Sequence, residues 1–330
     1  MPDNTTLNHI ARVLADVAPQ MPADAAIRRY FYAHKYLAPQ LRRAIAQGVF
    51  TYFRWKNWVD PKASKQTQAE HALRARPGKA GKLAETLGKC ELSEFAPDAV
   101  CYKGEKDLFR TPNFHEGEFE IQDLASQLVG LAALPTAGQT WWDACAGEGG
   151  KTLHLADMMN NKGLIWVTDR SEQRLQRFKK RATRANIHNL RRALWDGSSR
   201  RPSKAKFDGI LVDAPCSGIG TWQRNPHARW TTTMEDVKEL AHVQLELLNN
   251  VAPALKPGGR LIYAVCTLTR SETTEIAKAF TAAHPELTPS ISPLALEGAE
   301  PEDGHGLFIR PEVINGNGMY IAEWTKTATK

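Results

Sequence analysis

The sequence predicts an α/β protein with a parallel sheet and a smaller all-helical domain at its N-terminus. First, apolar residues recur at helical spacing before about residue 60. Second, short apolar runs alternate with amphipathic helices from Thr140 onward, which is typical of strand-helix-strand units. Third, 330 residues that are 42% hydrophobic can form two cores. We expect a helical domain with a linker over residues 1–90 and the sheet domain over residues 91–330.

The N-terminal region is expected to be helical from about residue 7 to 58. Apolar side chains at helical spacing support this: Leu7, Ile10, Val13, Leu14 and Val17, then Leu41, Ile45, Val49 and Phe53. The periodicity weakens over residues 60–90, where Asp60-Pro61-Lys62 and Arg76-Pro77-Gly78-Lys79 are turn signals. We predict a connecting segment there, with room for one exposed helix.

The elements of the second domain follow in order. A short extended region is expected around Phe109, Phe114 and Phe119, and then a helix from about Asp123 to Leu134. Five apolar runs predict strands, at residues 141–144, 164–168, 190–195, 207–212 and 260–265. The helix after the second strand begins at Ser171, a residue type that caps helices, and its exposed face is strongly basic.

Positive charge is concentrated near the N-terminus. Residues 1–90 hold 15 Lys and Arg against 6 Asp and Glu, although the whole chain carries only +7. Basic residues are interleaved there with aromatic ones, namely Arg28, Arg29, Lys35, Arg42, Arg43, Arg54 and Lys56 with Tyr30, Tyr36, Phe53 and Trp55. Such a surface could contact phosphates and stack on bases. A solvated helical face would have the same charge, so this pattern favours nucleic-acid binding only slightly.

The composition argues against several classes of protein. No apolar run reaches the roughly 18 residues that span a bilayer, and the start of the chain lacks the features of a signal peptide, so we expect a cytoplasmic protein without a membrane partner. The cysteines are odd in number and form no CxxC pair: Cys90, Cys101, Cys145, Cys216 and Cys266. This argues against a disulfide framework and a structural zinc site, so we expect reduced thiols and no metal.

A glycine-rich loop follows the first predicted strand and reads Cys145-Ala146-Gly147-Glu148-Gly149-Gly150-Lys151-Thr152. Its glycines let the backbone approach a ligand, and the first amides of the next helix face it. Asp169 ends the second strand, where a carboxylate can bind ribose hydroxyls. A dinucleotide dehydrogenase would fit these features almost as well. A phosphate-binding loop fits poorly, because Cys145 stands where its first glycine belongs.

Two cysteine motifs end the fourth and fifth predicted strands. They read Asp213-Ala214-Pro215-Cys216-Ser217-Gly218 and Tyr263-Ala264-Val265-Cys266-Thr267. Ligands of open parallel sheets lie beyond the carboxyl ends of the strands, so both cysteines should border the same site. Buried structural cysteines are the alternative, and it is weaker for two cysteines at strand ends beside an Asp.

These motifs together resemble the RsmB/Nop2/Sun family of RNA cytosine-5 methyltransferases. The resemblance rests on Gln122-Asp123 and on residues 145–152, 213–224 and 263–268, and it covers about residues 105–325. It implies a class I (Rossmann-like) methyltransferase sheet and S-adenosylmethionine as cofactor. It also implies an RNA partner, with ribosomal RNA favoured and transfer RNA second.

The resemblance implies roles for individual residues. Cys266 would attack the base and Cys216 would assist release of the product. The cofactor would be held by the glycine loop and by three acids at strand ends: Cys145, Ala146, Gly147, Glu148, Gly149, Gly150, Lys151, Asp169, Asp196 and Asp213.

The chemistry explains why such groups are needed. Carbon 5 of cytosine reacts poorly with a sulfonium methyl until a thiolate adds at carbon 6. A nearby Lys151 would favour the thiolate form of Cys266. Asp213 is the candidate for a hydrogen bond or proton at ring nitrogen 3, and Cys216, or a water that it positions, is the candidate base for the proton on carbon 5. The target base must be unstacked, so the expected substrate is a loop, a bulge or an opened helix.

The chain departs from the family pattern at three places. The family loop usually reads CAAPGGKT, whereas Gly147 and Glu148 stand here; the carboxylate could pair with the cofactor's ammonium or sulfonium, or disturb the loop. His227 follows Arg224-Asn225-Pro226 where an acid is usual. The nucleophile motif usually reads S-T-C-S and continues to E-N-E, whereas here it is Ala264-Val265-Cys266-Thr267 followed by Glu272-Thr273-Thr274. Two other functions stay open: an RNA-binding assembly factor without methyl transfer, and an oxidoreductase on a dinucleotide-binding fold.

Overall fold

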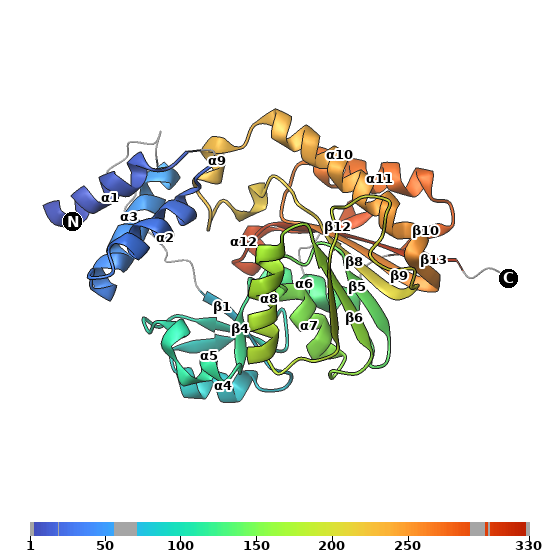
Figure 1. The fold of residues 1–330 in the computed structure, drawn as a ribbon, viewed down its shortest axis with the longest axis horizontal. Coiled ribbons are helices and arrows are strands. Elements are labelled where there is room, and N and C mark those ends of the chain that lie inside the picture. Colours follow the sequence, from blue (N-terminus) through green and yellow to red (C-terminus); the bar gives the residue numbers. More distant parts are fainter. Residues whose placement is uncertain (1–2, 19, 56–70, 291–300, 303, 328–330) are drawn as a thin grey trace. The chain divides into compact units, whose positions relative to one another are not determined.

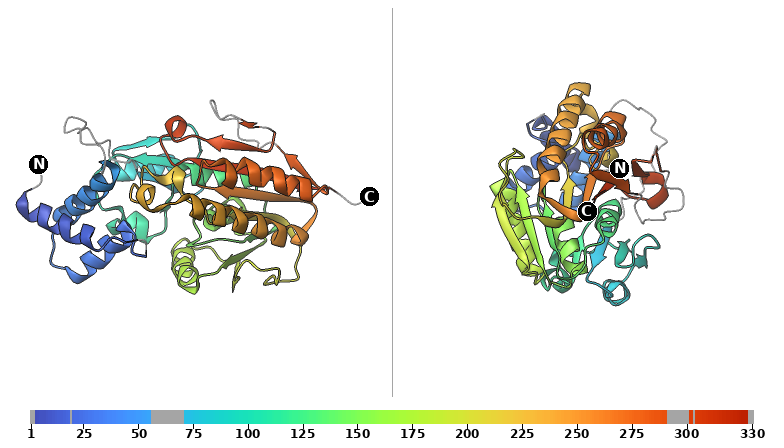
Figure 2. Two further views of the ribbon diagram at one scale, coloured as in Figure 1. Left: turned by 90° about the horizontal axis from the view of Figure 1, so that it is seen from above. Right: turned by 90° about the vertical axis from the view of Figure 1, so that its right-hand side faces the viewer.

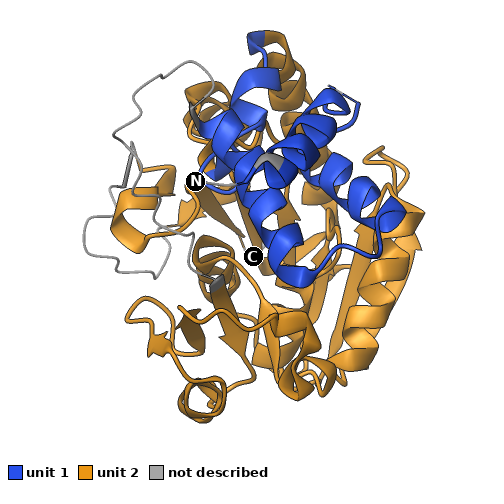
Figure 3. Cartoon of the chain, turned by 90° about the vertical axis from the view of Figure 1, so that its left-hand side faces the viewer, with its two compact units in different colours: residues 1–69, 221–234 blue, residues 70–220, 235–330 orange. Residues whose placement is uncertain are grey.

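The chain forms two compact units. The computed structural model describes residues 3–18, 20–55, 71–290, 301–302 and 304–327 (Figure 1). The helical unit comprises Met1–Ala69 with Thr221–Met234, and the sheet unit comprises Glu70–Gly220 with Glu235–Lys330 (Figure 3). This division differs from the boundary expected at residues 90 and 91. Part of the linker expected over residues 60–90 forms strands of the sheet unit, and residues 60–70 of it lie outside the described residues. Residues 221–234 belong to the helical unit, although they come much later in the sequence.

The helical unit has a small apolar core. Its helices are α1 (Asn4–Ala15), α2 (Ala23–Ala33), α3 (Pro39–Trp55) and α9 (Ala228–Thr231). Asp3 caps α1, because its carboxylate accepts a hydrogen bond from the Thr6 amide at 2.6 Å. The helices expected from the apolar spacing are confirmed, and their inner faces bury Ile10, Val13, Ile27, Ile45, Val49 and Phe53. The sequence did not indicate that Trp230 packs on this core and donates its indole N–H to the Phe53 carbonyl.

A small antiparallel sheet opens the sheet unit, with strand order β2-β3-β1-β4. Its region contains β1 (His71–Ala75), α4 (Ala80–Leu87), β2 (Cys90–Leu92), β3 (Ala99–Tyr102), η1 (Leu108–Arg110), α5 (Pro112–His115) and β4 (Phe119–Ile121). The prediction of extended structure is wrong for Phe109 and Phe114, which lie in short helical turns. The reason is local, because the Thr111 hydroxyl caps α5 and Pro112 occupies its first turn.

The main sheet has the order β11-β12-β13-β9-β8-β5-β6-β7, and β10 pairs with β13. Its parallel strands are β5 (Thr140–Asp143), β6 (Leu164–Asp169), β7 (Leu190–Leu194), β8 (Phe207–Asp213) and β9 (Leu255–Val265). The five predicted strands are confirmed, although β9 begins before residue 260. Strand order reverses beside β5, because β6 and β7 follow on one side and β8 and β9 on the other. Ligand sites of such sheets lie at this reversal.

Helices cover both faces of the main sheet (Figures 1 and 2). One apolar core unites the sheet with α6 (Leu124–Ala133), α7 (Gly150–Met158) and α8 (Glu172–Arg184). A second core unites it with α10 (Met234–Val251) and α11 (Thr274–Ala283). Asp123 caps α6, near where the sequence predicted a helix to begin, and Ser171 caps α8, as predicted. The parallel strands are therefore held rigidly from both sides.

An antiparallel edge completes the sheet. It contains β10 (Leu287–Ser290), β11 (Pro301–Glu302), β12 (Gly306–Ile309), α12 (Pro311–Ile314) and β13 (Met319–Lys326). Short 3-10 turns connect other elements: η2 (Ile219–Thr221), η3 (Ala252–Ala254) and η4 (Arg270–Glu272). None of the five strands predicted from the sequence lies in this edge, so its antiparallel strands were not predicted. β13 pairs with β9 from Tyr320 opposite Val265 to Thr325 opposite Arg260, and so covers the strand that leads to Cys266.

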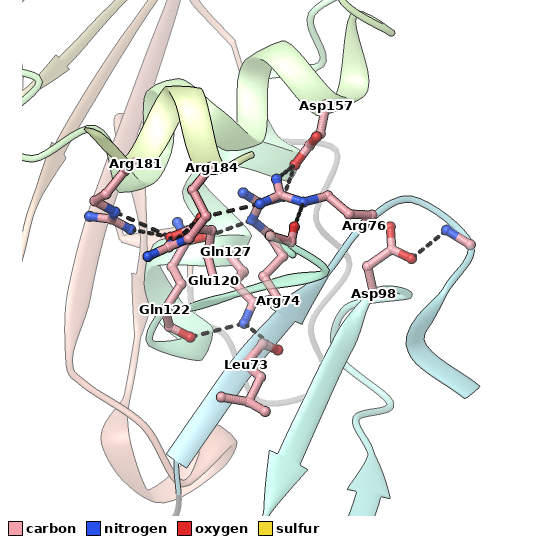
Figure 4. Close-up of polar contacts among 12 residues, drawn as sticks. Leu73, Arg74, Arg76, Asp98, Glu120, Gln122, Gln127, Asp157, Arg181 and Arg184 are labelled. Carbon is pink, nitrogen blue, oxygen red and sulfur yellow. Dashed lines mark hydrogen bonds and ion pairs between the residues drawn. The ribbon is translucent and has the colours of Figure 1, made fainter. Parts of the chain in front are cut away.

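A cluster of charged side chains joins the small sheet to α7 and α8 (Figure 4). Glu120 of β4 is 1% exposed and pairs with Arg181 and Arg184 at 2.8 and 2.7 Å. Burial alone would raise the pKa of Glu120, but the arginines outweigh burial and lower it. Arg74 of β1 is buried as well and pairs with Asp157 of α7. Arg181 and Arg184, two basic residues of α8, therefore connect this helix to the small sheet.

Candidate active site

The residues singled out from the sequence gather at the carboxyl ends of neighbouring parallel strands. The glycine loop follows β5, Asp169 ends β6, Asp196 follows β7, Asp213 ends β8 and Cys266 follows β9. Because these strands are adjacent in the order β9-β8-β5-β6-β7, their ends form one edge of the sheet. Cys216 reaches the same edge from the loop after β8, as its contact with Cys266 shows.

The glycine loop has a backbone that side chains would oppose. Gly147 and Gly149 have φ of 58° and 80°, the left-handed region that favours glycine. A Cβ on Gly149 would stand 2.0 Å from the ring of Phe178 on α8, so the loop lies close against that helix. The Gly147 amide donates to the Asp169 carboxylate at 2.9 Å. The end of β6 thereby holds the loop that follows β5.

Glu148, the unusual acid of the loop, turns toward α8. Its carboxylate pairs with Arg177 at 2.7 Å, and its carbonyl accepts a hydrogen bond from Arg181 at 3.0 Å. The Glu148 side chain is 43% exposed. Besides pairing with the cofactor and disturbance of the loop, the structure adds a third role for this carboxylate, an ion pair within the protein.

A cleft opens beyond β6 and β7. It has a volume of about 580 Å³ and is lined by Arg170, Leu194, Trp195, Asp196, Ser198, Arg200, Arg201 and Pro202. Asp196 is exposed and accepts a hydrogen bond from the Ser198 amide at 3.0 Å. The cleft begins directly after Asp169, and its lining is mostly polar.

The two cysteines face each other. The Sγ atoms of Cys216 and Cys266 are 3.3 Å apart, and both residues are half-buried free thiols. Beside them, the Lys151 ammonium donates to the Asp213 carboxylate at 2.7 Å. Burial would lower the pKa of Lys151, but the charge of Asp213 outweighs burial and raises it. A buried cation therefore stands next to the thiol pair.

The two thiols are not equivalent. The hydrogen bond from Cys216 lowers the pKa of Cys266, and the Lys151 charge lowers it further against the opposing effects of burial and Asp213. The pKa of Cys216 is raised by the same hydrogen bond, by burial and by the charges around it. Cys145 is different again, because burial and then Asp143 raise the pKa of its thiol. Of these three cysteines, Cys266 is the one prepared to be a thiolate.

Asp143 is a site residue that the sequence analysis missed. It ends β5 and is 1% exposed, and its carboxylate accepts a hydrogen bond from the Thr152 hydroxyl at 2.6 Å. Burial raises the pKa of Asp143 to about 7. Its position was the available signal. Asp143 is the last residue of its strand, directly before the glycine loop, just as Asp169 and Asp213 are the last residues of β6 and β8.

Glu272 and Gln244 are two more residues that the sequence analysis did not assign to the site. Both are 0% exposed, and the Glu272 carboxylate binds the loops that carry the two cysteines. Gln244 lies in the middle of α10, and an isolated Gln in a helix gives no signal for a site. Glu272 follows Cys266 closely in the sequence, so its nearness to that cysteine was the available signal.

The expected basic and aromatic surface of the helical unit is only partly present. Tyr36 is 76% exposed, as that surface requires, but Tyr30 and Phe53 are 6% exposed and belong to the core. The prediction is wrong for these two rings, because helical spacing turns them inward. Lys56 lies outside the described residues, and nothing is described of the Trp55 side chain. Tyr32, at 75% exposed, and Tyr52, at 44%, add aromatic surface that was not predicted.

The described residues contain no candidate metal site and no candidate membrane-spanning helix. Within the described ranges, no group of three or more His, Cys, Asp or Glu side chains could hold a metal ion. No helix in the described part of the chain is long and apolar enough to cross a membrane.

Comparisons with known proteins agree on one family. The model of the family described as 16S rRNA methyltransferase RsmB/F matches residues 131–325. A probable ribosomal RNA small subunit methyltransferase B of Bacillus subtilis (strain 168) is 36% identical over 246 residues, which cover 72% of this chain and 54% of that protein. The ribosomal RNA small subunit methyltransferase B of Vibrio vulnificus (strain YJ016) is 32% identical over 303 residues, which cover 90% of this chain and 68% of that protein. This chain thus spans about half to two thirds of the length of these curated relatives.

Solved structures share the fold. A methyltransferase homologue from Pyrococcus horikoshii superposes with a TM-score of 0.68 at 23% identity, covering 98% of this chain and all of that one. NSun6 from the same organism, solved with SFG, gives a TM-score of 0.70 at 18% identity over 86% of this chain and 94% of that one. The expected class I (Rossmann-like) methyltransferase sheet is confirmed. Together with the family match, these findings show that the chain belongs to the RsmB/F family of 16S rRNA methyltransferases.

Proposed function

We propose that this protein transfers a methyl group from S-adenosylmethionine to carbon 5 of a cytosine in RNA. The observation that carries the proposal is the pair of thiols, Cys216 and Cys266, 3.3 Å apart beside the ion pair of Lys151 and Asp213. Ribosomal RNA is the favoured substrate, because the relatives are named for it, and transfer RNA is second. A ribosomal substrate would place the protein in the cytoplasm.

The residues at the strand ends fit S-adenosylmethionine. The first amides of α7 have no carbonyl one turn earlier and can bind an acidic group. Asp169 can accept hydrogen bonds from ribose hydroxyls, and the cleft of about 580 Å³ beside it is large enough for an adenine ring. We therefore assign the cofactor to residues 145–151, Asp169, Asp196 and Asp213. When bound, S-adenosylmethionine supplies the methyl group as an electrophile.

We assign the attack on the base to Cys266. Its thiolate, favoured by the nearby ammonium of Lys151, adds to carbon 6 of the cytosine, which makes carbon 5 nucleophilic. The ring needs a proton or hydrogen bond at nitrogen 3 as the adduct forms. We assign this to Asp213, and Lys151, whose ammonium is 2.7 Å from that carboxylate, can supply the proton through it.

We assign the release step to Cys216. Once carbon 5 carries the methyl group, its proton must leave and the carbon–sulfur bond at carbon 6 must break. Cys216, after giving its own proton to water, or a water that it positions, takes the proton from carbon 5 and passes it to solvent. The electrons of the broken bond return to the sulfur of Cys266, and the proton on nitrogen 3 returns through Asp213 to Lys151, so the site is ready for another cycle.

Substituting the two cysteines separately tests this function. Cys266→Ala should form no adduct, and its methyl transfer should fall by several orders of magnitude while RNA still binds, because the nucleophile is gone. Cys216→Ala should attack the base but fail to release it. Its RNA should stay attached through a thioether, as a slow band on a denaturing gel that survives boiling.

Cys90→Ala is the matched control, because Cys90 lies on β2 of the small sheet, away from the strand ends that form the site. It should retain methyl transfer and trap no RNA. Trapped RNA in Cys266→Ala alone would reverse the two roles. Wild-type methylation with no adduct in any variant would refute the covalent route. Bisulfite sequencing of total RNA from cells with and without the gene would identify the cytosine.

A further inference from the structure

Glu272 is a fully buried carboxylate beside both cysteine loops. It ends the short turn η4, five residues after Thr267, and is 0% exposed. Burying a carboxylate is costly unless it is fully hydrogen-bonded. Five hydrogen bonds reach this carboxylate, and four of them come from the loops that carry Cys216 and Cys266.

The first pair of bonds fixes the Cys216 loop. Ser217, the next residue after Cys216, donates its amide to Oε1 of Glu272 at 2.8 Å and its hydroxyl to Oε2 at 2.5 Å. The second pair fixes the Cys266 loop. Thr267, the next residue after Cys266, donates its hydroxyl to Oε2 at 2.9 Å, and Thr269 does so at 2.8 Å. One carboxylate therefore joins the two loops directly beside their thiols.

Two further buried side chains set the orientation of Glu272. The Gln244 amide donates to Oε1 of Glu272 at 3.1 Å and to the carbonyl of Pro215 at 2.9 Å. The Tyr263 hydroxyl lies 2.9 Å from the Gln244 amide oxygen and 2.6 Å from the Glu272 carbonyl oxygen, both of which can accept its proton. The Cys216 loop is thus held on both sides of the cysteine.

The charges around the two thiols are arranged unequally. The groups that act on Cys216 are Cys266 and the carboxylate of Glu272, which opposes its ionisation. The groups that act on Cys266 are Cys216, Asp213 and Lys151, and of these Lys151 favours its ionisation. The hydrogen bond between the two thiols has the largest effect on both, so their difference in pKa depends first on the loops that keep them face to face.

We infer that Glu272 is a positioning residue that holds the Cys216 and Cys266 loops together and so keeps the two thiols facing each other. The inference rests on the function proposed above, because it explains how that site divides two roles between two cysteines. It concerns the thiols themselves, so it can be tested without RNA.

The test compares wild type with Glu272→Gln, which keeps the size of the side chain but replaces an acceptor with a donor. Each folded protein is treated with iodoacetamide between pH 6 and 9, and mass spectrometry follows Cys216 and Cys266 separately. With fewer bonds between the loops, the hydrogen bond between the thiols should weaken, so Cys216 should react at lower pH and Cys266 at higher pH. The ratio of Cys266 to Cys216 alkylation at pH 7 should fall about tenfold or more. Methyl transfer should also fall at least about tenfold, through lost positioning.

Glu323→Gln is the matched control. Glu323 is another buried glutamate of the sheet unit, 4% exposed, but it pairs with Arg260 and has no contact with either cysteine loop. It should alter stability without changing the alkylation ratio. If Glu272→Gln does not fold, Ser217→Ala removes the hydroxyl that contacts both Glu272 and Thr267. The Cys216 loop is then held less firmly against Cys266, and the alkylation ratio should fall in the same direction by less.

The outcomes separate this inference from the proposed function. An unchanged ratio in folded Glu272→Gln, or in Ser217→Ala where that variant replaces it, would overturn the inference, even if methyl transfer is lost. An equal fall of the ratio in Glu323→Gln would also overturn it. A fall confined to the Glu272 network would support it, even if wild type transfers no methyl group to RNA, which would count against the proposed function alone.

Discussion

Lys151 illustrates how single residues of this site gain their properties. It is 9% exposed, and such burial would favour a neutral amine, yet its bond to Asp213 keeps the ammonium charged. That charge is what the thiol of Cys266 needs, because a nearby cation favours the thiolate. Lys151, Asp213 and Cys266 therefore depend on one another, and none can be assessed alone.

Asp143 yields a prediction about pH. Its pKa in the fold, about 7, lies above the ordinary value of 3.8. The folded chain therefore binds more protons than the unfolded chain between these values, and stability must fall as pH rises through that window. Asp143→Asn removes this dependence. Relative to wild type, the variant should gain about 3 kcal/mol of unfolding free energy between pH 5 and pH 8.

Denaturant unfolding of both proteins at the two pH values measures that gain. The Asn oxygen can still accept the hydrogen bond from the Thr152 hydroxyl, so the substitution should leave the fold intact. A constant difference between variant and wild type at both pH values would show that Asp143 does not titrate in this range.

Which site residues were predictable follows from where they stand in the sequence. Cys216, Cys266 and Asp213 occur at strand ends, and the rule that such ends meet at one edge brings them together. Gln244 gave no such signal, because a polar residue inside an amphipathic helix normally faces solvent. Its burial depends on Tyr263 and Glu272, whose positions only the folded chain reveals.

At the scale of elements, the end of β6 and the loop after β5 form one unit. Asp169 accepts a hydrogen bond from the Gly147 amide at 2.9 Å and another from the Ser171 amide at 2.8 Å. The carboxylate thus shapes the glycine loop and caps the turn into α8 at the same time. A ligand that reaches Asp169 would find the loop already in place.

Asp169→Ala should therefore weaken S-adenosylmethionine binding. The loss of a charge-assisted hydrogen bond or two should cost on the order of 1.5 to 3 kcal/mol each, and RNA affinity should barely change. Calorimetry measures the cofactor affinity. Asp208→Ala serves as control, because Asp208 lies near the opposite end of β8 and pairs with Lys256. Full cofactor affinity in Asp169→Ala would refute the assignment.

β1 was not predicted from the sequence, and of β4 only the extended structure at Phe119 was expected. β1 carries Arg74 and β4 carries Glu120 at positions that are 1% exposed. A charged residue in the middle of a strand hides the alternation of apolar and polar residues that predicts strands. The parallel strands are easier to recognise, because they are buried on both faces and read as continuous apolar runs.

At the scale of the whole molecule, the excess positive charge predicts salt-dependent RNA binding. Arg28, Arg29 and Lys35 are exposed on the helical unit, and the Lys35 ammonium stands 4.7 Å from the centre of the exposed ring of Tyr32. If these side chains contact phosphates, replacing all three with Gln should reduce the slope of log affinity against log salt by about 2. Binding titrations at several salt concentrations measure that slope.

Lys238→Gln is a control of the same chemistry, because Lys238 is an exposed base on α10 that pairs only weakly with Glu235 at 3.7 Å. It should change the slope little. A triple variant with the wild-type slope would show that Arg28, Arg29 and Lys35 contact only solvent and not the phosphates of RNA. Deleting the first 90 residues is a poorer test, because it would also remove β1 and the core against which Trp230 packs.

The discontinuity of the helical unit has a consequence for how the chain folds during synthesis. The indole of Trp230 reaches the carbonyl of Phe53 across 177 positions of sequence, and residues 221–234 belong to the same compact unit as α1 to α3. The ribosome makes a chain from its N-terminus, and domains usually fold in that order. Here the helices emerge first but lack part of their core until residue 234 has been made. The helical unit can therefore be completed only after most of the parallel sheet has left the ribosome.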